Sequence, residues 1–102
     1  MRIYKITANG AVGVKHIADT VEAMEREVGG EIQRIRLFRD KDIICICSKN
    51  AFREKKPQNY TLPELLGDVF FVGVEGRLSY SLTDDQLKRV KLWLERRKQW
   101  KR

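Results

Sequence analysis

The chain has 102 residues, of which 42% are hydrophobic and 34% are charged, and its formal net charge is +7. This length predicts one domain, and no apolar run approaches the roughly 18 residues that a membrane-spanning helix needs. The N-terminal residues lack the apolar stretch of a signal peptide, so we expect a protein that stays in the cytoplasm and has no membrane partner.

The positive charge is concentrated at the C-terminus. Residues 88–102 hold eight basic side chains against Glu95 alone, so this stretch accounts for the whole excess of +7. Such a concentrated field attracts anions, including nucleic acid, phosphorylated small molecules and acidic protein surfaces. A basic, solvated helix face that only keeps the domain soluble is the alternative.

A β-hairpin is expected at the N-terminus. Residues 2–7 favour a first strand, and Asn9-Gly10 is a strong turn signal. A short return strand through Val12 and Val14 would follow, with His16 in the next loop.

Residues 19–28 favour a helix. Asp19 and Glu22 have the spacing of a capping box, and Gly29-Gly30 is typical of a helix end with one residue in the left-handed conformation. Met24 falls on the apolar side of this helix, where we expect it to fill the core.

The middle of the chain indicates a second hairpin. Residues 31–38 and 43–48 are rich in β-forming side chains and flank the polar turn 39–42. The second run is apolar on both faces, so this strand is expected to be central or covered. Cys45 and Cys47 share one face of it, and adjacent cysteines on one strand bridge poorly, so buried, reduced thiols are expected.

An irregular segment separates this hairpin from the most apolar run of the chain. Residues 49–63 are long for a loop in a small domain, and such loops are often functional. Leu62, Leu65 and Leu66 suggest a short helical turn that fastens the end of the loop to the core. Residues 68–74 predict a central strand.

The last twenty residues, 83–102, predict a basic helix. Thr83 and Gln86 form a capping box, and acidic residues fill the first turn. Leu82 and Leu87 have the spacing of a hydrophobic staple. An apolar stripe along the helix, widened by Trp93, is expected to face the core.

These elements together predict a single α+β domain over residues 1–102. We expect a mainly antiparallel sheet of four or five strands with two helices packed on it. The sequence contains no internal repeat and no linker.

Metal binding and catalysis find little support. Cys45, Cys47 and His16 are too few and too badly spaced for a zinc site, and nothing brings the histidine to a cysteine as a catalytic base. The acidic pairs have structural explanations in a turn and a helix start. We therefore expect a protein that is not an enzyme and needs no cofactor.

Anion binding is better supported, and two sets of residues could provide it. The loop offers cations beside hydrogen-bonding and stacking groups, and two strand arginines could add guanidinium forks for phosphate. This first set is Arg53, Lys55, Lys56, Asn59, Tyr60, Arg34 and Arg36. The second set, on the final helix, is suited to nucleic acid and comprises Lys88, Lys91, Arg96, Arg97, Lys101 and Arg102. Trp93 and Trp100 could alternatively anchor a homodimer or a protein partner.

Three segments together resemble a family of small uncharacterised proteins of phages, plasmids and other bacterial mobile elements. They are the helix end Val28–Ile32, the strand Gly67–Gly73 and the helix start Ser81–Gln86. The resemblance covers about residues 17–90. The chain departs from the family pattern in the loop, where Tyr60 replaces an arginine, and in its basic tail.

The resemblance implies a biological setting, that of mobile genetic elements, more than it implies a chemical activity. Small non-enzymatic proteins of mobile elements often counteract host defence, by sequestering a nucleotide signal or by binding a defence protein. The leading hypothesis is therefore an anti-defence factor in a bacterial cytoplasm that binds a phosphate-bearing ligand such as a nucleotide signal. Nucleic-acid binding through the basic helix and inhibition of a host defence protein are the alternatives.

Overall fold

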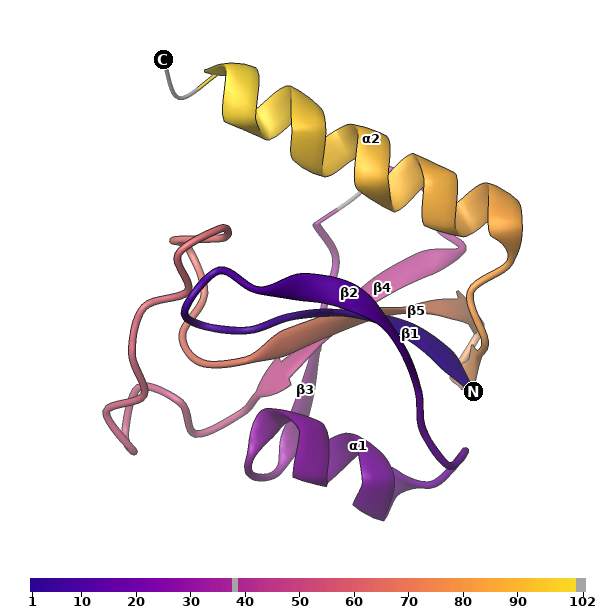
Figure 1. Ribbon diagram of the computed structural model, residues 1–102. Coiled ribbons are helices and arrows are strands. Elements are labelled where there is room, and N and C mark those ends of the chain that lie inside the picture. Colours follow the sequence, from indigo (N-terminus) through magenta and orange to yellow (C-terminus); the bar gives the residue numbers. More distant parts are fainter. Residues whose placement is uncertain (38, 101–102) are drawn as a thin grey trace.

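The computed structural model describes residues 1–37 and 39–100, with the side chains of residues 98–100 excepted. Within these residues, a six-stranded sheet lies between two helices, which confirms the predicted α+β class (Figure 1). The elements are β1 (Arg2–Ile6), β2 (Val12–His16), α1 (Val21–Val28), β3 (Ile32–Ile35), β4 (Ile43–Ser48), β5 (Val69–Glu75), β6 (Leu78–Tyr80) and α2 (Asp84–Trp100).

The sheet is antiparallel in every described pair and has the order β2-β1-β5-β4-β3. Strand β5 is central: β4 lies along one edge, and the other edge is shared by β1 and by the short strand β6. All residues of β4 and β5 except Glu75 are buried. The prediction that both runs form covered, central strands is confirmed, because their side chains are apolar on both faces.

Each face of the sheet is covered by one helix. On one face, Phe71 of β5 packs in a cluster with Val90 and Leu94 of α2. On the other face, Phe70 of β5 packs with Met24 and Val28 of α1. In Figure 1, α2 accordingly lies above the sheet and α1 lies below it.

The start of α2 is closed by the predicted capping box. The backbone N–H of Gln86 donates to Thr83 Oγ1 at 3.1 Å, and the backbone N–H of Thr83 donates to Gln86 Oε1 at 2.9 Å. The Gln86 side-chain amide also donates to the Asp42 carbonyl oxygen at 2.9 Å, which ties the helix start to β4. Gly73 leaves room for this contact, since a Cβ there would lie 3.0 Å from Gln86 Oε1.

Several local predictions were wrong. The N-cap of α1 is Thr20, whose hydroxyl accepts from the Ala23 N–H at 3.1 Å, and Asp19 lies outside the helix. His16 belongs to β2, paired with Arg2, instead of to a loop. Strand β6 was not expected, and β3 ends at Ile35, short of the predicted end at Phe38, which lies outside the described residues. Residues 62–65 form a hydrogen-bonded turn and no helix.

The irregular segment between β4 and β5 is organised around the fully buried Asn59. Its side-chain amide donates to the carbonyl oxygens of Ile6 and Gly67, at 3.3 and 3.0 Å. Its side-chain oxygen accepts from the N–H groups of Thr61 and Leu62, at 3.1 and 2.9 Å. One buried side chain thus satisfies four backbone groups, one in β1 and three in a segment that has almost no regular structure.

Replacement of Asn59 by alanine is expected to lower the free energy of unfolding by about 2–4 kcal/mol, because buried backbone groups lose their partners. Urea denaturation followed by circular dichroism measures this change. Arg53→Ala is the matched control, since Arg53 is an exposed residue of the same segment and should change stability by about 0.5 kcal/mol or less. Equal stability of the native protein and the Asn59 variant would contradict the assigned role.

Candidate functional site

The loop residues predicted to bind a ligand do not converge on one site. Asn59 has no exposed surface and serves the fold. Lys56 extends to the C-terminal end of α1, where its ammonium donates to the Gly29 carbonyl oxygen at 3.2 Å. Tyr60 is 80% exposed and lines a different hollow, beside α2. Arg53 and Lys55 are exposed and line none of the described pockets.

The two strand arginines hold turns of the chain. Arg34 on β3 donates to the Arg77 carbonyl oxygen at 2.8 Å and to Ser79 Oγ at 3.3 Å. Arg36 donates to the Lys41 carbonyl oxygen at 3.0 Å. These bonds use part of the capacity of both guanidinium groups, and none of the partners belongs to the 49–63 loop.

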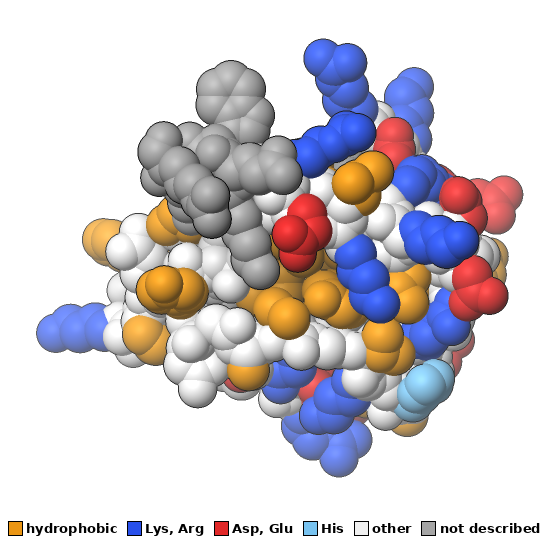
Figure 2. Space-filling view, turned by 45° about the horizontal axis from the view of Figure 1, so that its top comes forward, with side chains coloured by type: hydrophobic (Ala, Val, Ile, Leu, Met, Phe, Trp, Pro, Cys, Tyr) orange, Lys and Arg blue, Asp and Glu red, His pale blue; other side chains and the backbone are white. Residues whose placement is uncertain are grey.

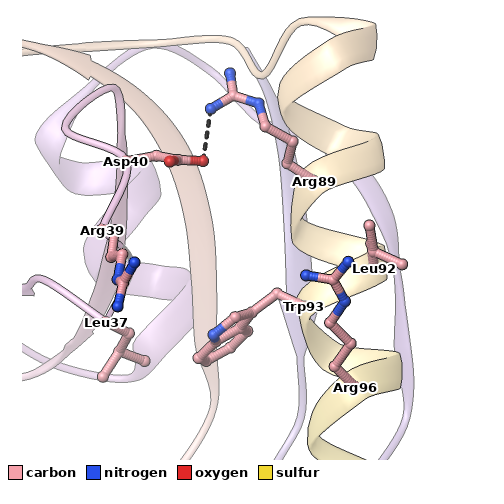
Figure 3. Close-up of a pocket in the computed structure, with 7 residues that line it drawn as sticks. All are labelled: Leu37, Arg39, Asp40, Arg89, Leu92, Trp93 and Arg96. Carbon is pink, nitrogen blue, oxygen red and sulfur yellow. Dashed lines mark hydrogen bonds and ion pairs between the residues drawn. The ribbon is translucent and has the colours of Figure 1, made fainter.

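A groove of about 530 Å³ lies between α2 and the residues Leu37, Arg39 and Asp40. Figure 3 shows the aromatic ring of Trp93 reaching from the helix toward Leu37 and Arg39. Seven side chains line this space: Leu37, Arg39, Asp40, Arg89, Leu92, Trp93 and Arg96. We call it the Trp93 groove.

An ion-pair network closes one end of the Trp93 groove and fixes its walls to each other. Arg89 donates to Asp40 at 2.8 Å, to Asp42 at 2.7 and 3.0 Å, and to Asp85 at 2.9 Å. The hydrogen bonds from Arg89 lower the pKa of the Asp42 carboxyl to about 2, with a further contribution from Gln86. The same bonds raise the pKa of Arg89.

Trp93 is held in place on two sides. Its ring meets Phe71 edge-on, with the ring centroids 5.9 Å apart. The Arg97 guanidinium lies 4.8 Å from the Trp93 ring centroid and also pairs with Glu64 at 2.6 Å. The ring is therefore held in a fixed position at the wall of the groove.

Two guanidinium groups of the groove are not used by the fold. Arg39 and Arg96 are exposed, and neither makes a hydrogen bond or ion pair to another side chain within residues 1–37 and 39–97. Arg89 is already occupied by three carboxylates. Arg39 and Arg96 are thus the cations of this groove that remain available for an incoming anion.

The remaining cations of α2 have mixed surroundings. Lys88 is exposed outside the groove, Lys91 lies over the Tyr4 ring on the opposite side of the helix, and Arg97 is paired as described. Lys101 and Arg102, which were predicted to bind nucleic acid, lie outside the described residues, as does the side chain of Trp100.

Comparison with known proteins gives a family. A family model described as a domain of unknown function, DUF3846, matches residues 1–95. The chain belongs to the DUF3846 family. No curated protein and no solved structure matches the chain. The expected membership of an uncharacterised family is thereby confirmed. The description of the family names neither a ligand nor a reaction.

The described part of this DUF3846 member shows neither a metal centre nor a membrane span. No group of three or more His, Cys, Asp or Glu side chains in it is placed to hold a metal ion. None of its helices is long and apolar enough to cross a membrane. Cys45 and Cys47 are free and buried on the α2 side of the sheet, and burial raises the pKa of both thiols.

The stability of the protein should depend on pH through Asp42. Its pKa is about 2 when folded and 3.8 ordinarily, so the stabilisation is present above pH 3.8 and is lost as the pH falls through 2. Because this carboxylate is 47% exposed, solvent screening leaves about 1 kcal/mol of the effect.

Unfolding free energies measured between pH 5 and pH 2 for the native protein and for Asp42→Asn provide the check. The difference between the two proteins should shrink toward zero as the pH falls. Asp84→Asn is the control, since Asp84 is exposed and contacts Arg2 instead of the network. A difference that stays constant across this range would contradict the assignment.

Proposed function

We propose that this protein is a non-enzymatic binding protein that holds a nucleotide-type ligand in the Trp93 groove. The observation that carries the proposal is the placement of two guanidinium groups, Arg39 and Arg96, beside a fixed aromatic ring, neither group having a side-chain partner in the part of the chain that the structure describes. A nucleotide combines the two complementary features, a planar base and a phosphate group.

The charge of the groove supports an anionic ligand. Among its lining cations, Arg89 is neutralised by the carboxylates of Asp40, Asp42 and Asp85, whereas Arg39 and Arg96 have no carboxylate partner among the described residues. Guanidinium groups bind phosphate through paired N–H donors, and such charge-assisted hydrogen bonds are stronger than neutral ones. Phosphate would therefore lie between Arg39 and Arg96, which project from opposite walls of the groove (Figure 3).

The apolar lining supports a planar group on the same ligand. Leu37 and Leu92 border the groove on either side of Trp93. A base stacked on an aromatic side chain gains about 1–3 kcal/mol, and this gain does not require a particular base. The groove thus favours nucleotides as a class, cyclic or linear.

The biological role that we propose is anti-defence. The resemblance to proteins of phages and plasmids makes sequestration of a nucleotide signal in a bacterial cytoplasm a fitting role for a small protein that binds without catalysis. Nucleic-acid binding by α2 has less support, because Arg97, one of the residues expected to provide it, is already paired with Glu64.

Calorimetric titration of the full-length protein with a panel of cyclic and linear nucleotides tests the proposal. We expect at least one nucleotide to bind, and we expect Arg39→Ala and Arg96→Ala each to weaken that binding about tenfold by removing a charge-assisted hydrogen bond. In a Trp100→Phe background, the fluorescence of Trp93 should change on binding.

Two control variants separate the groove from the alternatives. Lys88→Ala removes an exposed cation of α2 outside the groove, and Arg53→Ala removes one from the loop. Both should bind like the native protein. A panel in which no nucleotide binds would remove the proposal, and a loss confined to Arg53→Ala would move the site to the loop. A single-stranded oligonucleotide that binds far more tightly than any mononucleotide, with a steep salt dependence, would favour nucleic-acid binding instead.

A further inference from the structure

The outer edge of the sheet at β2 is open. Within the described residues, β2 pairs only with β1, so the backbone groups on its other edge have no strand partner. Val12 and Val14 lie opposite Ile6 and Tyr4, and these pairs place both valines on the α2 side of the sheet. They are 50% and 44% exposed, because α2 does not reach the last strand.

Tyr60 stands beside this edge as a positioned, exposed aromatic ring. Gly10, in the tip of the β1–β2 hairpin, has a φ of +99°, and a Cβ there would lie 3.1 Å from a Tyr60 ring atom. The Tyr60 N–H donates to the Ala8 carbonyl oxygen at 2.9 Å. The ring thus rests against the hairpin although most of its surface faces solvent.

A hollow of about 290 Å³ joins these features to α2. Tyr4, Val12, Tyr60 and Leu94 contribute to its lining, with Lys91 and Glu95 from the helix. Figure 2 shows hydrophobic side chains gathered on this face of the molecule, with Lys and Arg side chains around them. We call the hollow together with the exposed side of β2 the β2 edge surface.

Lys91 and Glu95, one turn apart on α2, give the β2 edge surface one cation and one anion, and Lys91 is the charge above the strand next to β2. Its ammonium lies 6.0 Å from the centroid of the Tyr4 ring, above the strand next to β2. Among the described residues it has no carboxylate within ion-pair distance. A cation in this position favours a carboxylate brought by a partner.

We propose that the β2 edge surface binds an extended segment of a partner protein, which adds to β2 as a further strand. Main-chain hydrogen bonds to the open edge would supply affinity, and alternate side chains would supply specificity. On the α2 side, the segment presents an apolar residue beside Val12 and Tyr60, and an acidic residue two positions away that reaches Lys91. This surface is separate from the Trp93 groove, and the proposal does not depend on nucleotide binding.

A second copy of the chain fits this surface less well. Strand β2 has the sequence VGVKH, which contains no acidic residue. Two copies paired through β2 would therefore bring no β2 carboxylate to Lys91. The partner we infer is a different protein with an apolar and acidic strand.

Selection from a displayed library of random peptides of about ten residues, long enough to span β2, tests this inference on the full-length protein. We expect enriched peptides in which acidic and apolar residues alternate. Val14→Lys should weaken the binding of these peptides about tenfold or more, because it places a long charged side chain at the pairing edge. Gln33→Lys, on the exposed strand β3 at the opposite edge, is the matched control and should leave binding unchanged.

A charge reversal sharpens the test. Selection on Lys91→Glu should enrich basic peptides in place of acidic ones. All three positions are exposed, and unfolding midpoints confirm that each variant folds. Peptides that bind Val14→Lys as well as the native protein, or an unchanged peptide charge on Lys91→Glu, would overturn the inference. A dimer by light scattering that Val14→Lys converts to monomer would also overturn it, in favour of self-association.

Discussion

The ion-pair network of Arg89 is the interaction on which the rest of the α2 face depends. Apolar packing alone leaves a helix free to slide or rotate on a sheet, because the hydrophobic effect has no direction. Arg89 adds directional bonds to Asp40 and Asp42 in the turn before β4, and Gln86 adds another to Asp42. One helical turn thus fixes both the position of α2 and the width of the Trp93 groove.

This network also explains what the sequence could and could not predict. The capping box of Thr83 and Gln86 was predicted correctly because its partners are three residues apart. The partners of Arg89 in the turn lie 47 and 49 residues away, so no local pattern shows them. Residues 39–42 were interpreted only as a polar turn, although Arg39 and Asp40 line the candidate site.

Asn59 shows why residue type alone misled the prediction of the ligand site. A side-chain amide in a basic loop can bind a ligand. The same amide can instead donate and accept the hydrogen bonds that buried, irregular backbone groups require. Asn59 is buried and bonds to the backbone, whereas Tyr60, the next residue, is exposed to solvent. The expected first and central strands, in contrast, followed from short apolar runs rich in β-forming side chains, a signal that is local in the sequence.

The width of the sheet accounts for the two surfaces beside α2. A helix with its side chains is about 10 Å wide, which covers roughly two strands spaced about 4.8 Å apart, and five strands lie side by side here. A single helix on that face therefore leaves a hollow on each flank. On the β3–β4 side, unpaired arginines and Trp93 make the flank cationic and aromatic. On the β2 side, the edge valines and Tyr60 make it mainly apolar. The basic side chains of α2 thus fall into three groups: those paired with carboxylates, those that line the Trp93 groove, and Lys91 at the β2 edge surface. One basic helix can therefore contribute to two surfaces of different chemistry.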